Sequence, residues 1–292
     1  SRQGVQDLVF DRSRNRTRLL ANQLATDLER YQQPLGALAW EIGNSRTAQG
    51  TVPPTLDTEW PGGELGIFDA GVLILDPNRT IVAAVPTLSE LVGETLPVNT
   101  APPRNPEPQP GPQRPAELGL TNIHADLFES SEVVAMLYPL GGNGEGEDHG
   151  AVVGLFQIER QATRTSPFYR NIWELYIGRQ ISPGPSTGSQ VAGQEAACLI
   201  DGNGRIIFHT DTFLIGEEAS RYTSVQRAIR GEVGAMRTQP IWNPEGPDVV
   251  TGYSPVPFTS WALITEEPWS QVTRVSRPYT YGTLALLVLG TL

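Results

Sequence analysis

Apolar residues recur at steps of three and four over the first forty positions, which is the spacing of one face of an α-helix. The pattern predicts an amphipathic helix of unusual length over residues 1–48, and we expect Pro34 to end or kink it. A stalk that rises from a membrane and a coiled-coil or packing helix are two compatible interpretations of this helix. Its apolar positions are Val5, Leu8, Val9, Leu19, Leu20, Leu24, Leu28, Tyr31, Leu35, Leu38 and Ile42.

One shorter pattern occurs twice further along the chain. An apolar run that ends at Leu75 is followed by the turn Asp76-Pro77-Asn78 and a second apolar run, and the same order surrounds Asp201-Gly202-Asn203. Aspartate, asparagine and glycine tolerate the backbone conformations that tight hairpin turns require. A repeat of this length predicts two related structural modules, each with its own sheet.

The remaining pattern of apolar and polar residues predicts two antiparallel sheets joined by helices. Strands are expected at 71–75, 80–84, 133–140 and 151–159 in the first repeat, and at 197–200, 205–209, 234–238, 249–255 and 261–266 in the second. Helices are expected at 87–91, 167–181 and 220–230, and the proline-rich segment 97–115 cannot form a core. The fold class is therefore α+β, with a long N-terminal helix followed by two tandem PAS-like modules with antiparallel sheets.

Charge and composition narrow the range of partners. The formal net charge of -11 leaves no broad basic surface, so the sequence excludes nucleic acid as a partner. The single cysteine, Cys198, lies in an expected strand and is interpreted as a core residue rather than a nucleophile. Residues 279–292 are uncharged and mostly apolar, and a spanning helix needs about 20 such residues. We interpret this run as the start of a transmembrane helix; the alternative is a short buried helix.

The order of these segments resembles that of a double Cache domain, the extracytoplasmic sensor of bacterial transmembrane receptors. The second repeat carries most of the resemblance, and the first repeat carries the rest in residues 72–82, 136–140 and 150–155. The matching pieces of the second repeat are Leu199 to Asp211 with Ile215-Gly216, Gly231 to Gly234, Gly252 to Pro257, and Trp261 to Pro268.

This resemblance implies an organisation for the whole chain. It comprises a stalk helix at 1–48, a membrane-distal module at 49–165, a linker helix with a membrane-proximal module at 166–278, and the start of a transmembrane helix at 279–292. The distal module would bind a small molecule, and the proximal module would relay the change to a histidine kinase, diguanylate cyclase or chemoreceptor output. The resemblance further implies a cell-membrane location with this domain on the extracytoplasmic side, anchoring through the flanking helices, and a homodimer in the full-length receptor.

The candidate ligand-binding residues are Asp126, His124, Tyr138, Phe128 and Trp60. The family's amino-acid signature closes with Tyr-x-Asp, and His124 and Asp126 fall at that place, with histidine in place of tyrosine. A proline-rich insertion stands where the signature has its aromatic pair, so the ligand stays unidentified, with an amino acid or a carboxylate among the candidates. An aspartate there can bind a ligand ammonium, but it can equally cap a turn or helix, and the aromatic residues can equally be core.

No motif of a known catalytic centre is present. The sequence lacks a Gly-x-Ser-x-Gly elbow, a His-Glu-x-x-His pair and a phosphate loop, and its three histidines lack metal-ligand spacing. We therefore expect no catalytic residue, no cofactor and no metal site, and we expect His209 to lie at a strand tip on the surface. Two alternatives stay open: a structural or partner-binding ectodomain without a small-molecule ligand, and an extracellular hydrolase with a nucleophile near His124 or His209.

Overall fold

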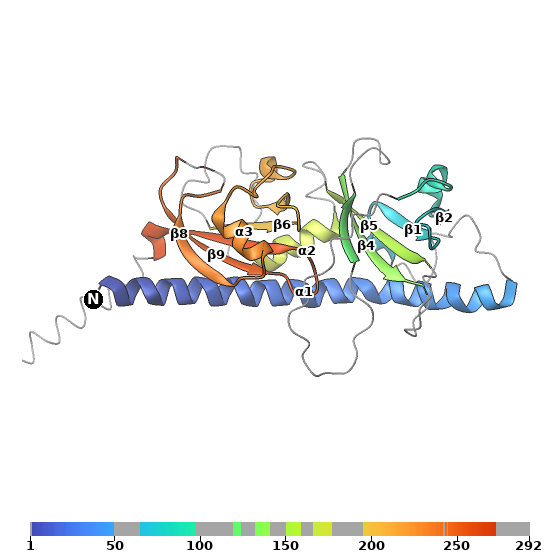
Figure 1. The fold of residues 1–292 in the computed structure, drawn as a ribbon, viewed down its shortest axis with the longest axis horizontal. Helices are drawn as coiled ribbons and strands as arrows, with labels where there is room; N and C mark the ends of the chain where they lie inside the picture. Colours follow the sequence, from blue (N-terminus) through green and yellow to red (C-terminus); the bar gives the residue numbers. More distant parts are fainter. Residues whose placement is uncertain are drawn as a thin grey trace, which may run out of the picture. The chain divides into compact units, whose positions relative to one another are not determined.

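The computed structural model describes residues 2–49, 65–96, 119–123, 132–140, 150–158, 166–176, 195–241, 243 and 245–272. The predicted transmembrane run at 279–292 and the whole proline-rich segment 97–115 lie outside these residues. A single helix, α1 (Arg2–Gln49), forms the N-terminal part of the chain (Figure 1). It continues through Pro34, so the expected end of the helix at this residue is wrong. The hydrogen bond that proline cannot make is offset by burial of Leu35, Leu38 and Ile42 in the following turns.

The chain divides into two compact units, each with one sheet. The first unit contains Asn22–Ile177 and Val256–Ser260, and the second contains Ser1–Ala21, Gly178–Pro255 and Trp261–Leu292. The helix α2 (Pro167–Tyr176) belongs to the first unit, where Phe168 lies 4.9 Å from Phe156 between ring centroids. Both units contain residues of α1: residues 22–49 belong to the first unit and residues 2–21 to the second.

The first unit holds a five-stranded antiparallel sheet in the order β2-β1-β5-β4-β3. Its strands are β1 (Gly71–Leu75), β2 (Ile81–Ala84), β3 (Gly119–Ile123), β4 (Glu132–Pro139) and β5 (Ala151–Ile158). The predicted helix at 87–91 is a 3-10 helix, η2 (Pro86–Leu91). Four of the strands were expected, whereas β3 was not predicted, because Gly-Leu-Thr-Asn-Ile has too few apolar residues to alternate clearly.

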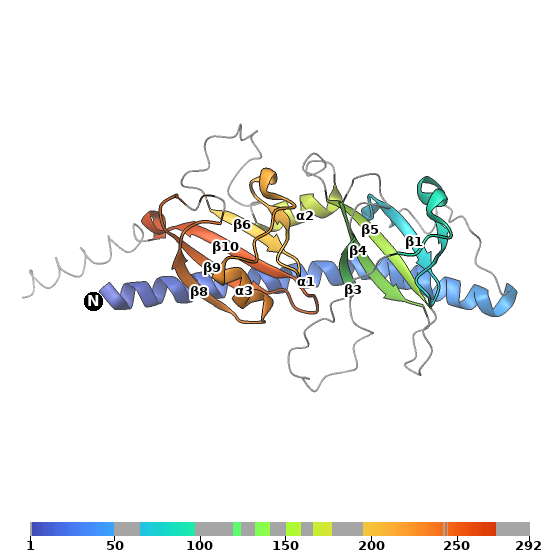
Figure 2. The same ribbon diagram turned by 45° about the horizontal axis from the view of Figure 1, so that its top comes forward.

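The second unit repeats this topology with the order β7-β6-β10-β9-β8 (Figure 2). Its strands are β6 (Ala196–Ile200), β7 (Ile206–His209), β8 (Gly234–Thr238), β9 (Val249–Pro255) and β10 (Ala262–Pro268), with the short helices η5 (Thr212–Leu214) and α3 (Thr223–Ile229) between β7 and β8. The identical order of pairing confirms the predicted α+β fold with two PAS-like modules.

The two hairpins that define the repeat are built by the same local hydrogen bonds. The carboxylate of Asp76 accepts from the backbone N–H groups of Asn78 and Thr80, each at 2.8 Å. The carboxylate of Asp201 accepts from those of Asn203 and Arg205 at 2.9 and 2.8 Å. Side chains that bond to the backbone two residues ahead stabilise turns locally, and this is why the repeat could be recognised in the sequence.

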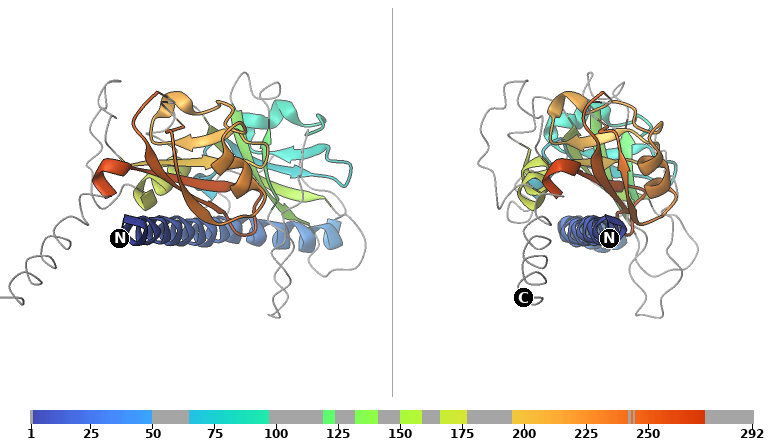
Figure 3. Two further views of the ribbon diagram at one scale, coloured as in Figure 1. Left: turned by 60° about the vertical axis from the view of Figure 1, so that its left-hand side comes forward. Right: turned by 90° about the vertical axis from the view of Figure 1, so that its left-hand side faces the viewer.

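Each sheet has two different faces. In the first unit, Leu73, Ala135 and Leu155 pack with Leu91 and Leu96 on a face that we call the inner face. In the second unit, the inner face carries Cys198, Ile264 and Tyr253, which pack with Val225 and Ala228 of α3. The opposite face of each sheet, the α1 face, packs on the long helix. For the second unit, Figure 3 shows the blue helix running alongside the orange and red strands.

Candidate functional site

Four of the five predicted ligand-binding residues lie outside the described part of the chain. These are Trp60, His124, Asp126 and Phe128. Their role as ligand contacts therefore stays a prediction.

The fifth residue, Tyr138, is half-buried on β4. Side chains alternate between the two faces of a strand, and Ala135 belongs to the inner face. Tyr138 therefore lies on the α1 face. A methyl group added at Gly36 of α1 would lie 3.1 Å from the Tyr138 ring, so the ring and the helix backbone are in close contact there.

Aromatic residues fill the middle of the same face in the first unit. Phe156 lies between Tyr31 of α1, Phe68 and Phe168, with ring centroids at 5.7, 5.0 and 4.9 Å. The Tyr31 hydroxyl accepts a hydrogen bond from the side-chain amide of Asn171 on α2. Burial raises the pKa of Tyr31, and its contact with Asn171 opposes this shift. This cluster is a packed core that joins α1 and α2 to the sheet.

The inner face of the second unit is polar at one end. His209, Cys198, Glu266 and Thr251 stand on four adjacent strands, β7, β6, β10 and β9, and all four are buried. Cys198 pairs directly with His209, and Glu266 pairs directly with Thr251. Buried polar groups on a face that otherwise packs apolar residues are costly, so this row is a candidate site in its own right.

Glu266 is the most unusual member of the row. Its carboxyl oxygens lie 3.1 and 3.3 Å from the backbone nitrogen of Ile241, which donates to them, and Thr251 Oγ1 donates from 3.4 Å. Burial raises the pKa of Glu266 to about 8, and the two hydrogen bonds oppose the shift only in part. At neutral pH this residue is therefore mainly a neutral carboxylic acid.

His209 is buried, with 1% of its surface exposed, so its expected position at the surface is wrong. Its Nδ1 accepts a hydrogen bond at 2.8 Å from the backbone N–H of Asp211, as the chain turns into η5 and closes over the strand end. Burial lowers the pKa of His209 to about 4, which the charge of Asp211 opposes. The imidazole is therefore neutral. Burial also raises the pKa of the Cys198 thiol well above its usual range, and the charge of Glu266 adds to this effect.

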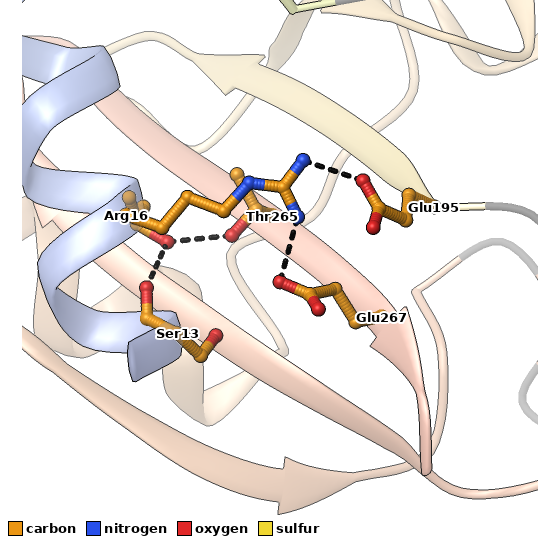
Figure 4. A network of polar contacts seen from close by, with 6 residues as sticks. Ser13, Arg16, Glu195, Thr265 and Glu267 are labelled. Carbon is orange, nitrogen blue, oxygen red and sulfur yellow. Dashed lines mark hydrogen bonds and ion pairs between the residues drawn. The ribbon is translucent and has the colours of Figure 1, made fainter. Parts of the chain in front are cut away.

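The α1 face of the second unit is also polar (Figure 4). Thr17 of α1 lies 2.5 Å from Thr265 of β10 between hydroxyl oxygens, and it donates to the backbone oxygen of Ser13 at 2.9 Å. Ser13 and Thr17 are buried although neither is apolar. Gly252 of β9 lies opposite them, and a methyl group there would overlap Thr17 Oγ1 and lie 2.9 Å from Ser13 Oγ. Helix and sheet thus approach closely across small residues.

Arg16 flanks this contact with charge. Its guanidinium pairs with Glu267 of β10 at 2.8 Å and with Glu195 just before β6 at 2.5 Å. Burial alone would lower the pKa of Arg16, but its hydrogen bonds and charge pairing with Glu195 and Glu267 raise it above its ordinary value. Glu267 is 7% exposed, so at least one of these ion pairs is shielded from water. The pairs fix which turn of α1 lies on β10.

Sequence reasoning missed both polar groups of the second unit. Glu266 and Glu267 could have been found as adjacent acids inside an apolar strand, since one of them must face the core when both faces are covered. Ser13 and Thr17 lie at helical spacing, four residues apart, but their burial depends on Gly252, which is distant in the sequence.

Comparison with proteins of solved structure identifies the fold. The ligand-binding domain of the Pseudomonas fluorescens chemoreceptor CtaA, in complex with L-isoleucine, matches with a TM-score of 0.56 at 13% identity over 94% of this chain and 98% of that one. The extracellular domain of a protein assigned as the histidine kinase rpHK1S-Z16 matches with a TM-score of 0.54 at 17% identity, over 89% and 94%. A similar extracellular domain, from mmHK1S-Z3, matches with a TM-score of 0.52 at 13% identity, over 93% of this chain and 98% of that one.

These likenesses confirm the double Cache fold that the sequence indicated. The matched structures are sensor domains of kinases and chemoreceptors rather than catalytic domains, and they extend over nearly the whole chain. No protein-family model matches the sequence. No curated protein matches it either.

Among the described residues, none of the helices is both long enough and apolar enough to cross a membrane. Within the same residues, no group of three or more histidine, cysteine, aspartate or glutamate side chains could hold a metal ion.

Proposed function

We propose that this chain is the extracytoplasmic ligand-sensing domain of a transmembrane signal-transduction receptor of the histidine kinase, diguanylate cyclase or chemoreceptor type. The observation that carries this proposal is the full-length likeness of the two-unit fold to sensor domains of that kind, one of them with L-isoleucine bound. Fold likeness alone does not determine function, so the ligand needs a separate argument.

The ligand site that we propose lies in the first unit, the membrane-distal module of the resemblance. Asp126 would accept hydrogen bonds from a ligand ammonium, and His124, Phe128 and Trp60 would line the site. The described inner face of this unit carries apolar side chains such as Leu73, Ala135 and Leu155. Tyr138 lies on the other face, against Gly36, and we do not count it among the ligand contacts. The ligand class that fits this contact is a small amino acid, because it carries an ammonium group.

A thermal-shift screen of the 292-residue chain tests the proposal. Amino acids including L-isoleucine, small carboxylates, polyamines and purines would be added separately at millimolar concentration. A specific ligand should raise the melting temperature in proportion to the logarithm of its concentration, because it binds only the folded state. If every compound left the melting temperature unchanged, ligand sensing would lose its support.

The location and assembly of the receptor belong to the same proposal. The domain would stand on the extracytoplasmic side of the cell membrane, anchored through the flanking helices. In the full-length receptor it would form a homodimer, and ligand binding would favour one of two arrangements that the membrane helices transmit.

One observation favours a second function, a partner-binding ectodomain. Leu8, Leu19 and Trp40 of α1 are 68%, 64% and 72% exposed. Leu8 and Leu19 are eleven residues, about three turns, apart, so they lie on the same side of the helix. Large exposed apolar side chains can mark a protein interaction surface. Light scattering of the chain and of a Leu19→Glu variant would show whether this side of the helix mediates self-association.

A further inference from the structure

The internal repeat provides a built-in comparison for the buried acid of the second unit. Leu75 pairs with Ala151 in the first sheet, and Ile200 pairs with Ala262 in the second, and both hairpins shift register at this point. Leu155 lies four residues after Ala151 on β5, and Glu266 lies four residues after Ala262 on β10, so Leu155 is the counterpart of Glu266. The same register relates the whole row, residue by residue: His209 to Ala84, Cys198 to Leu73, Glu266 to Leu155, and Thr251 to Ala135.

The fold therefore does not require polar residues at these four positions. In the first unit all four counterparts are apolar, buried and part of the inner-face core. A buried carboxyl costs free energy unless it is fully hydrogen-bonded or paired. The second unit has this cost at a position where the corresponding residue of the first unit is a leucine, so the fold itself does not require an acid there.

The neighbours of Glu266 do not neutralise it. Around it stand the Cys198 thiol of β6, with His209 of β7 beyond, and the Thr251 hydroxyl of β9, which lies 2.6 Å from the Thr238 hydroxyl of β8. The charged side chain of α3 near this face, Arg227, lies over the Tyr253 ring and pairs with Glu232.

The adjacent acid shows the contrast. Glu267 points to the opposite face of the sheet and pairs with Arg16, whereas in the part of the chain that the structure describes no cation pairs with Glu266. A proton is therefore the species that keeps this site neutral.

Glu266 also holds a loop. Its oxygens accept the backbone N–H of Ile241, in the connection between β8 and β9. The carbonyl oxygen of the same residue accepts a hydrogen bond at 2.9 Å from the Tyr222 hydroxyl, next to α3. Ile241 is 6% exposed and packs in the inner-face core. Ile241 therefore connects the Glu266 carboxyl to the Tyr222 hydroxyl and to the inner-face core.

We propose that Glu266 is a proton-dependent latch in the second unit: the protonated acid keeps Ile241, which follows β8, packed in the inner-face core, and its ionisation favours opening at this residue. The closed form binds the proton more tightly than an open form in which water solvates the carboxylate. The equilibrium constant for opening must then rise about tenfold per pH unit over the pH range in which Glu266 is ionised in the open form but protonated in the closed form. That window extends from near the ordinary glutamate pKa of 4.5 to about 8. A pH change in the medium would act on this unit without a ligand.

Hydrogen–deuterium exchange of the Ile241 amide, resolved by mass spectrometry, tests the latch between pH 5.5 and 7.5. Intrinsic exchange already rises about tenfold per pH unit, and opening adds the same factor when reclosing outpaces exchange. The logarithm of the Ile241 rate should therefore rise with pH at a slope of about two in the wild type, and about one in Glu266→Gln, which keeps the acceptor for Ile241 but cannot ionise. The matched control Glu267→Gln should retain a slope of about two.

Each outcome decides the proposal. A slope near one at Ile241 in the wild type would overturn it, and this result does not depend on whether Glu266→Gln folds. A slope of two at every protected amide of β9 and β10 would also overturn it, since the proton would then act on global unfolding and not on the loop. A slope of two confined to the β8–β9 loop would establish the latch.

Discussion

Gly252 is the residue at which the contact between α1 and the second sheet can be tested most sharply. In Gly252→Ala, the new methyl group would overlap Thr17 Oγ1 and approach Ser13 Oγ to 2.9 Å. Thr17 cannot turn away freely, because its hydroxyl is held by Ser13 and Thr265 and its residue is fully buried. The helix must therefore shift. Overpacking of this kind costs about 1–3 kcal/mol, offset by up to about 1 kcal/mol because alanine loses less chain entropy than glycine.

A glycine of α1 that has free space around it provides the control. A methyl group at Gly43 of α1 would meet nothing within 4 Å. Gly43→Ala should therefore raise the free energy of unfolding by about 0.5–1 kcal/mol, while Gly252→Ala should lower it by about 1–2 kcal/mol. Urea denaturation followed by circular dichroism measures both values on the intact chain.

A second substitution shows whether Gly252→Ala destabilises the protein through its clash with Thr17 or in a general way. Thr17→Ala removes the atom that the new methyl group would meet, at the cost of two buried hydrogen bonds, about 1 kcal/mol each. The double variant should be more stable than the sum of the two single effects predicts, by about 1–2 kcal/mol. If Gly252→Ala were as stabilising as Gly43→Ala, or if the two effects simply added, the close approach of helix and sheet would be refuted.

Two further predictions concern the hairpin turns of the two units and His209. Gly204 has a φ of +97°, and its counterpart in the first hairpin, Arg79, has a φ of 66°. Gly204→Ala should destabilise the protein by about 1–3 kcal/mol, because the new methyl group would also lie 2.6 Å from Ser220 Cβ. Arg79→Gly should be neutral or stabilising by up to about 1 kcal/mol in the same urea assay. His209 takes up a proton near pH 6.5 in the unfolded chain and only near pH 4 in the folded chain. The contribution of the neutral, buried imidazole to stability is therefore complete above pH 6.5. It is lost as the pH falls from 6.5 to 4, at about 1.4 kcal/mol per pH unit. The stability difference between the wild type and His209→Asn should therefore narrow over this range, and a constant difference would contradict the buried neutral imidazole.

Local chemistry explains how much of the fold could be predicted from the sequence. The two hairpins were predicted because Asp76 and Asp201 organise their turns through bonds to neighbouring residues. The edge strand β3 was missed because an edge strand needs little apolar alternation. Pro34 did not end α1, since burial of the following turns outweighs the local penalty.

The polar sites depend on contacts that sequence spacing does not contain. His209 was expected at a strand tip on the surface, yet it is buried and its Nδ1 accepts a hydrogen bond from the backbone N–H of Asp211. The helical pattern treated Leu8 and Leu19 as part of the packed face, but both are exposed, while Ser13 and Thr17 are buried against the sheet. Small polar residues can pack a helix closely only where a partner such as Gly252 is present, and that partner is distant in the sequence.

The central claim, ligand binding in the first unit, is tested most directly by titration calorimetry with the compound that stabilises the chain most in the thermal-shift screen. The wild type should bind it at one site. Asp126→Asn removes the charge but keeps the capping ability of this residue, so it should weaken binding at least about tenfold without lowering the melting temperature. Glu267→Gln, in the second unit, should leave affinity unchanged. Equal affinity of the wild type and Asp126→Asn, or loss of binding in Glu267→Gln alone, would contradict the account.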